Sequence, residues 1–173
     1  MRKGKELQGL AVVDIGTGTK LGSVDEPIVS LSDGRIVGVM VKGGSGGRRG
    51  YVAAGDIRSI GTDAVTVASG DVLHDEADLD EATREAWEAR KHLVGNKVMT
   101  EGGTLLGTVS DYYVDEHAAR VAGLTIGGGL LSSEDALAAD RVVSVGPDAI
   151  VVREEAGEGH DAPEGGATGW AGR

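Results

Sequence analysis

The sequence predicts an all-β fold: two small antiparallel β-barrels in tandem, joined by a short α-helical linker. Three observations carry this prediction. The chain repeats its own pattern at a spacing of about 85 residues, β-branched runs alternate with glycine-containing turns, and large aromatic side chains are nearly absent. With 30 glycines, no phenylalanine and 40% hydrophobic residues among 173, the core must consist of Val, Ile, Leu and Ala.

Composition and charge exclude several classes of protein. The net charge of −11 makes the long-range interaction with phosphate groups repulsive. We therefore do not expect direct binding to nucleic acid or to an anionic membrane. The absence of cysteine excludes disulfides and thiolate metal sites. No apolar run approaches the length of a membrane span, and no apolar stretch follows the basic first residues as in a signal peptide. We therefore expect a soluble, cytoplasmic protein.

The internal repeat is carried by glycines as well as by apolar residues. Gly22 aligns with Gly107 and Gly38 aligns with Gly123, and Val, Ile and Leu alternate with one another at the positions between. Apolar matches arise easily in a valine-rich chain, whereas a glycine marks a place where the backbone conformation is special. The matched glycines therefore indicate two copies of one domain.

Each copy is predicted to form five or six short strands. In the first copy, Asp33-Gly34 is a hairpin signal between a strand that ends near Leu31 and the β-branched run 35–42. The second copy has the matching run 120–126. Closing hairpins are predicted at 57–60 with 64–68, and at 142–145 with 149–152. So few strands leave unprotected edges unless the sheet curls into a barrel or sandwich.

Between and after the copies the composition changes. Residues 71–92 are predicted to form an acidic helical linker that is capped by Asp75 or Asp78, with acids in its first turn. Its apolar stripe is expected to contain Leu79, Ala82, Ala86, Ala89 and Leu93. The expected organisation is a first repeat at 1–70, the linker at 71–92, a second repeat at 93–153 and a disordered tail at 154–173, which has too little apolar surface to fold.

Both copies resemble the PRC-barrel domain. The residues that carry the resemblance are the L-x-G motif at 7–9 and 93–95, the L-G-x-V motif at 21–24 and 106–109, and the closing segments at 57–61 and 145–152. The resemblance covers both repeats but not the linker or the tail. It implies an interaction module whose motif glycines are structural, and it carries over no catalytic residue.

Known members of this family include the cytoplasmic domain of the photosynthetic reaction-centre H subunit and the C-terminal domain of a ribosome-maturation factor. The present chain lacks the membrane helix of the first and the separate N-terminal domain of the second. It is most similar to the stand-alone bacterial and archaeal forms, here in tandem.

The loop from Lys42 to Tyr51 is the most unusual segment and is a candidate partner-binding site. It combines five glycines with the hydroxyl of Ser45 and the cations Lys42, Arg48 and Arg49, a set that can hold a phosphate or an acidic protein surface. It lacks the Gly-Lys-Ser/Thr ending of a nucleotide-binding loop. The alternative interpretation is a solvated hairpin connection.

The matching segment of the second copy is apolar and then acidic, with Leu130, Leu131, Glu134 and Asp135. The two loops therefore cannot bind the same ligand. We predict instead that they complement each other between molecules, with the arginines of the first loop facing these acids. The leucines form a contact site if they project outward; alternatively they fold back over the end of the barrel.

The remaining chemical signals are weak. His74, His117 and His160 lie beside acids, but adjacent residues point apart, so solvated acidic patches are expected rather than metal sites. The run 16–22 enters a strand and not a helix, so it is a β-turn and not a dinucleotide loop. We predict no catalytic residue, no cofactor and no metal site, and therefore no enzyme.

Three functions follow from this reading. The first is a non-enzymatic protein–protein interaction or assembly module whose protein partner the sequence does not identify; the alternatives are a ribosome- or RNA-processing-associated factor and a small-ligand or ion-binding barrel. A barrel of about sixty residues buries only about 60% of its unfolded surface. We therefore expect the two barrels to pack as a pseudo-symmetric pair, or the chains to self-associate.

Overall fold

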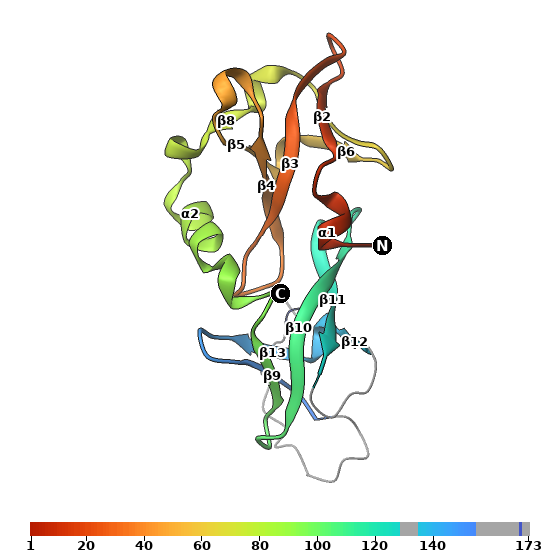
Figure 1. Cartoon of the computed structure of the whole chain (residues 1–173), viewed down its shortest axis with the longest axis vertical. Coiled ribbons are helices and arrows are strands. Elements are labelled where there is room, and N and C mark those ends of the chain that lie inside the picture. Colours follow the sequence, from red (N-terminus) through yellow and green to blue (C-terminus); the bar gives the residue numbers. More distant parts are fainter. Residues whose placement is uncertain (129–134, 155–169, 171–173) are drawn as a thin grey trace.

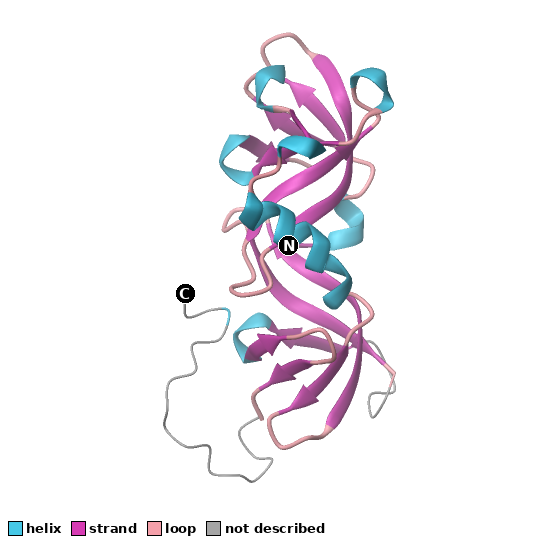
Figure 2. Cartoon of the chain, turned by 90° about the vertical axis from the view of Figure 1, so that its left-hand side faces the viewer, coloured by secondary structure: helices cyan, strands magenta, loops and turns pink. Residues whose placement is uncertain are grey.

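The computed structural model describes residues 1–128, 135–154 and 170. The molecule is elongated and consists of two curled β-sheets placed end to end, with the first repeat at one end and the second at the other (Figure 1). Short helical turns and one longer helix lie against the sheets (Figure 2). The predicted mostly-β fold with two repeats and a helix between them is confirmed.

The first sheet has the strand order β6-β7-β2-β3-β4-β5-β8. Its strands are β2 (Ala11–Asp14), β3 (Thr19–Val29), β4 (Ile36–Lys42), β5 (Gly50–Ala53), β6 (Ile57–Ile60), β7 (Ala64–Val67) and β8 (His74–Asp75). Neighbours are antiparallel except for β2 and β7, which are parallel. The predicted antiparallel pairing holds for the other neighbours of this sheet, and the parallel pair forms where the curled sheet brings β7 back onto β2.

The second sheet repeats this plan in the order β12-β11-β10-β9-β14-β13. Its strands are β9 (Lys97–Thr100), β10 (Leu105–Asp115), β11 (Arg120–Gly127), β12 (Asp135–Ala138), β13 (Val142–Val145) and β14 (Ile150–Val152). Here too the first and last strands, β9 and β14, pair in parallel. A two-residue strand from the start of the chain, β1 (Arg2–Lys3), pairs with β10.

The helical elements are short. They are α1 (Gly4–Leu7), α2 (Glu81–Glu88) and the 3-10 turns η1 (Ser45–Gly47), η2 (Ala54–Asp56), η3 (Gly70–Val72), η4 (Glu76–Asp78), η5 (Ala89–His92) and η6 (Ala139–Arg141). When the two repeats are aligned, η5 corresponds to α1, and each lies just before the strands of its barrel. The leucine of the first L-x-G motif, Leu7, is the last residue of α1, and the leucine of the second, Leu93, follows η5 directly.

The matched glycines stand where two strands cross closely. A Cβ on Gly22 would lie 2.7 Å from the carbonyl oxygen of Lys42, and a Cβ on Gly107 would lie 2.7 Å from the carbonyl oxygen of Gly127. No side chain fits in that space, so the glycine of the L-G-x-V motif sets how tightly each sheet can curl.

The two repeats are joined by the tips of their long hairpins. The N–H of Ile36 donates to the carbonyl of Ala119 at 2.8 Å, and the N–H of Val121 donates to the carbonyl of Gly34 at 2.8 Å. In the alignment of the repeats, Ile36 matches Val121 and Gly34 matches Ala119, so the second bond is the first one with the two repeats interchanged. The contact therefore has the two-fold form of a symmetric dimer interface. The residues at its centre, which are also counterparts, form an antiparallel bridge: Arg35 and Arg120.

A single hydrophobic core runs through both repeats. It contains Val12 and Val24 of the first repeat, Val98 and Val109 of the second, and Leu7 of α1, all at most 2% exposed. The prediction that the two barrels pack against each other is therefore confirmed.

The linker differs from its prediction in detail. Its helix, α2, begins after Asp80, whose carboxylate accepts the N–H of Thr83 at 2.8 Å. The predicted caps Asp75 and Asp78 are wrong, because residues 74–75 pair as β8 with the edge of β5 instead. Ala82 of the predicted apolar stripe is exposed.

The helix packs on the outer face of the first sheet through a side chain that the stripe did not include. Trp87 is 6% exposed and forms a second hydrophobic cluster with Ile28, Met40, Leu79 and Ala86. The predicted tail lies outside the described residues at 155–169 and 171–173. Trp170 differs from the prediction of an unfolded tail, since it is 1% exposed and belongs to the main core.

Candidate functional site

The basic loop between β4 and β5 is anchored to β3. One oxygen of Asp25 lies 3.1 Å from the guanidinium of Arg49, and the other lies 4.0 Å from Nζ of Lys42. These two candidate residues are therefore tied to the barrel that carries them. Arg48, which lies between Lys42 and Arg49 in the sequence, is exposed and has no ion-pair partner within the ranges that the structure describes.

Aromatic contacts connect the same loop to the linker. The guanidinium of Arg49 lies 5.6 Å from the ring centre of Trp87, and that of Arg90 lies 3.8 Å from it. The ring of Tyr51 lies 5.4 Å from that of His74. Arg49 and Tyr51, predicted to bind a partner, thus hold the linker against the first sheet. Cation–π pairs of this kind contribute about 0.5–2 kcal/mol each.

Of the candidate residues in the second loop, only the backbone of Asp135 lies among the described residues. Leu130, Leu131 and Glu134 lie outside the described residues, as does the side chain of Ser45 in the first loop. Asp135 opens β12, where its backbone pairs with Ile126. The strands that lead into the two loops lie in opposite halves of the elongated molecule (Figure 1). Within one chain the strands that flank the two loops are therefore not brought together.

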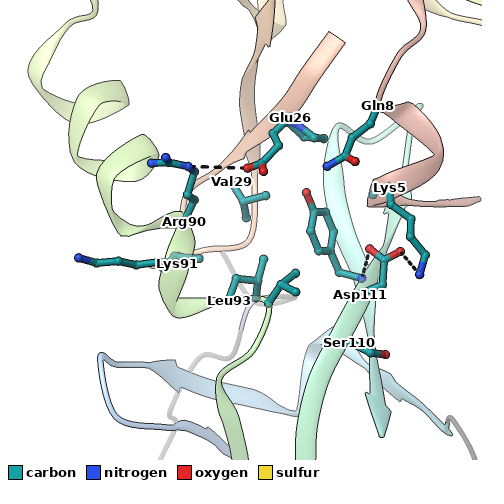
Figure 3. Close-up of a pocket in the computed structure, with 14 residues that line it drawn as sticks. Lys5, Gln8, Glu26, Val29, Arg90, Lys91, Leu93, Ser110 and Asp111 are labelled. Atoms are coloured by element: carbon teal, nitrogen blue, oxygen red, sulfur yellow. Dashed lines mark hydrogen bonds and ion pairs between the residues drawn. The ribbon is translucent and has the colours of Figure 1, made fainter.

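A cavity of about 460 Å³ lies where the two repeats meet (Figure 3). Its apolar lining comes from both halves: Val29, Leu31, Leu93 and Val94. The polar residues of its lining form ion pairs across the junction. Arg90 lies 3.8 Å from Glu26, and Nζ of Lys5 lies 3.9 Å from Asp111.

These ion pairs follow the two-fold relation between the repeats. Glu26 and Asp111 are counterparts on the long strands β3 and β10. Glu26 of the first repeat faces Arg90, from the helical turn before the second barrel. Asp111 of the second repeat faces Lys5, from the helical turn before the first barrel. Burial raises the pKa of Tyr112, and the negative charges of Glu26 and Asp111 raise it further, so its phenol stays neutral at physiological pH. The polar groups of the cavity thus serve to join the halves.

The sequence analysis missed a structural carboxylate, Asp14. One of its oxygens accepts the N–H groups of Gly16 at 2.7 Å and Thr17 at 3.3 Å, and the other accepts the N–H of Gly70 at 3.0 Å. The signal in the sequence is an Asp followed by Gly and Thr after a strand, which is typical of an Asx turn. Asp14 fastens the first hairpin to the start of the linker.

The histidines are spread over separate elements. His74 lies in β8 beside Tyr51, His117 lies in the turn after β10, and His160 is outside the described residues. Among residues 1–128, 135–154 and 170, no three His, Asp or Glu side chains gather as metal ligands would. The predictions on cofactors and catalysis remain predictions.

Comparison with known proteins gives one match. The family model described as the PRC-barrel domain matches residues 1–73 and, a second time, residues 88–158. No curated protein matches the chain. In the part of the chain that the structure describes, every helix is too short or too polar to cross a membrane.

Proposed function

The chain belongs to the PRC-barrel family, with two copies of the domain in tandem, and from this premise we propose that it is a non-enzymatic interaction module. In this proposal the body of the molecule is a spacer that carries a partner-binding loop at each end. The shared core and the hydrogen-bonded hairpin tips support it, since they fix the two ends relative to each other.

The observation that carries the proposal is the construction of the basic loop. Asp25 and Trp87 hold Arg49, so the loop has a fixed base, while its neighbour Arg48 is exposed. A cation presented on a braced loop suits an acidic protein surface. From the sequence, we offer the acids Glu134 and Asp135 of a second copy as one such partner.

Two loops on one rigid body also permit bivalent binding. When one loop is engaged, the other meets its partner at an effective concentration set by the spacing of the loops, which strengthens binding without new contacts. The tandem arrangement would then raise overall avidity beyond that of a single barrel by about 10²–10⁴ where the geometry permits both contacts.

We expect Arg48→Glu to reduce partner capture at least tenfold without changing the thermal midpoint. Tagged wild type and variant are used to capture partners from native lysate, with and without nuclease, and read by mass spectrometry. The matched control is Arg58→Glu, the same charge change on exposed Arg58 of β6. Arg49→Glu is not a clean test, because it also breaks the contacts with Asp25 and Trp87.

Partners that survive nuclease and are lost only with Arg48→Glu support the interaction module. Partners that vanish with nuclease favour the RNA-associated alternative. Equal capture by wild type, Arg48→Glu and Arg58→Glu contradicts the assignment of the loop.

A further inference from the structure

The cavity where the repeats meet (Figure 3) follows their two-fold relation. Its volume of about 460 Å³ lies within the range of small-molecule sites, about 300–1,000 Å³. Its lining contains three pairs of residues that match when the repeats are aligned: Glu26 with Asp111, Pro27 with Tyr112, and Lys5 with Lys91. A ligand whose two ends are alike is therefore the best match to the shape of this site.

A buried carboxylate in the lining retains an unused acceptor. The side chain of Asp111 is 4% exposed, and its Oδ1 accepts the N–H of Tyr112 at 2.8 Å. Its Oδ2 accepts no hydrogen bond from the described residues. The ammonium of Lys5 lies 3.9 Å from this oxygen, beyond the usual hydrogen-bond distance of about 2.7–3.2 Å. Because a buried acceptor without a donor costs free energy, Asp111 has a place for a donor from a ligand.

The matching carboxylate, that of Glu26, is also only loosely paired. Its oxygen lies 3.8 Å from Nε of Arg90, which is again too far for a hydrogen bond. The guanidinium of Arg90 has other partners, since it donates to the carbonyl of Trp87 at 2.7 Å and lies 3.8 Å from the centre of the indole ring. Glu26 is half-buried, so its carboxylate can be reached by a small molecule.

The charges around the cavity favour a cation. Burial raises the pKa of Tyr112, and the negative charges of Glu26 and Asp111 raise it further. The cations of the lining do not offset these charges at the phenol, because Lys91 points away from the cavity (Figure 3) and Lys5 is exposed. The net charge of −11 adds a long-range attraction for positive ligands.

We propose that this cavity binds a linear alkyl diamine, with one ammonium group at Asp111 and the other at Glu26. An ammonium group has up to three donors and supplies Oδ2 of Asp111 with the hydrogen bond that it lacks. The methylene chain packs on the apolar lining of Pro27, Val29 and Leu93. The two ends of the ligand are identical, so each contacts the carboxylate of a different repeat and the ligand bridges the two halves.

Calorimetric titration of the full chain with 1,4-diaminobutane and with 1,5-diaminopentane tests the proposal. Salt at about 0.15 M screens general attraction to an acidic protein, and ligand concentrations up to about 10 mM detect a Kd of about 1 mM. We expect saturable binding of a diamine, at least tenfold weaker binding of 1-aminobutane, and no binding of 1,4-butanediol. The proposal is overturned if neither diamine saturates, or if 1-aminobutane binds as tightly as the diamines.

Two variants locate the site. Asp111→Asn and Glu26→Gln each keep the shape of the side chain and remove one carboxylate, so each is expected to weaken diamine binding at least tenfold. The control is Asp63→Asn, the same charge change in the exposed turn between β6 and β7, which is expected to leave binding unchanged.

If Asp111→Asn does not fold, Glu26→Gln at the half-buried position carries the test. Unchanged binding by either folded variant, or an equal loss with Asp63→Asn, would assign the binding to the general charge of the protein and overturn the proposal. The basic loop takes no part in this experiment, so failure of the proposed function at Arg48 leaves its result standing.

Discussion

At the scale of single residues, Asp14 has the most backbone contacts of the side chains described above. Burial alone would raise its pKa, but hydrogen bonds from the N–H groups of Gly16, Gly70 and Thr17 and from the Thr17 hydroxyl outweigh burial and lower it. The unfolded chain therefore binds a proton more readily than the folded one. The contribution of Asp14 to stability is present above about pH 4 and is lost as pH falls through the folded pKa.

We expect Asp14→Ala to destabilise the protein at pH 7 and to have a smaller effect at pH 3, where the wild-type carboxylate is itself being protonated. Urea unfolding at the two pH values measures both differences. Asp63→Ala, in the exposed turn between β6 and β7, is the control and is expected to stay within about 0.5 kcal/mol of wild type. An undiminished effect of Asp14→Ala at pH 3 would contradict the role given to its charge.

The candidate site could be predicted only in part, and the reason is visible at Arg49 and Arg48. Both are cations in one glycine-rich loop, and no local pattern distinguishes them. The structure separates them because Asp25 comes from an adjacent strand and Trp87 from the linker. Contacts between segments far apart in the sequence leave no local pattern, so Arg49, which has these two partners, could not be told from Arg48.

At the scale of elements, the linker helix is held mainly by one side chain. Trp87 is buried between α2 and the outer face of β3 and β4, with Ile28 and Met40 beneath it. The capping residue Asp80 defines where the helix begins, whereas Trp87 defines where it packs. The stripe expected from the sequence included Leu79 and Ala86, which lie in this cluster, but not Trp87, whose ring buries far more area than an alanine methyl.

We expect Trp87→Ala to lower the free energy of unfolding by about 3–5 kcal/mol, because it opens a cavity under the helix and removes the stacking of two arginines. Chemical denaturation followed by circular dichroism gives the value. Glu85→Ala, on the exposed side of the same helix, is expected to change it by less than about 0.5 kcal/mol. Equal effects of the two substitutions would show that the helix does not depend on this contact.

The strands were predictable and the helix boundaries were not. Runs such as 35–42 and 120–126 are set by β-branched residues and a turn signal close at hand, so local patterns suffice. The start of α2 depends on whether residues 74–75 are free to join it, and they pair with the edge of β5. That pairing is decided by a neighbouring strand and not by the acidic residues that favour a helix start.

At the scale of the whole molecule, the two repeats behave as one body. Val12 and Val98 are counterparts on β2 and β9, both fully buried and both part of the same core. The hydrogen-bonded hairpin tips add a continuous backbone connection between the sheets. Unfolding of one half would expose core and leave backbone groups of the other half unpaired, which couples the two halves.

We expect Val12→Ala and Val98→Ala each to cost about 2 kcal/mol and each to lower the midpoint of one shared thermal transition. Differential scanning calorimetry tests this by comparing the calorimetric with the van't Hoff enthalpy. The matched pair is its own control, since each variant weakens a different repeat. A second transition that responds to only one of the two substitutions would show that the repeats unfold separately.

The difference between Gly34 and Ala119 has a consequence for symmetry. In a dimer of identical barrels the two positions would carry the same residue. Among the described residues of this chain, Gly34 packs against the indole of Trp170, whereas Ala119 at the matching position carries a Cβ, so the two halves present different surfaces at the junction. A single methyl group at position 119 thus gives a nearly symmetric body a polarity.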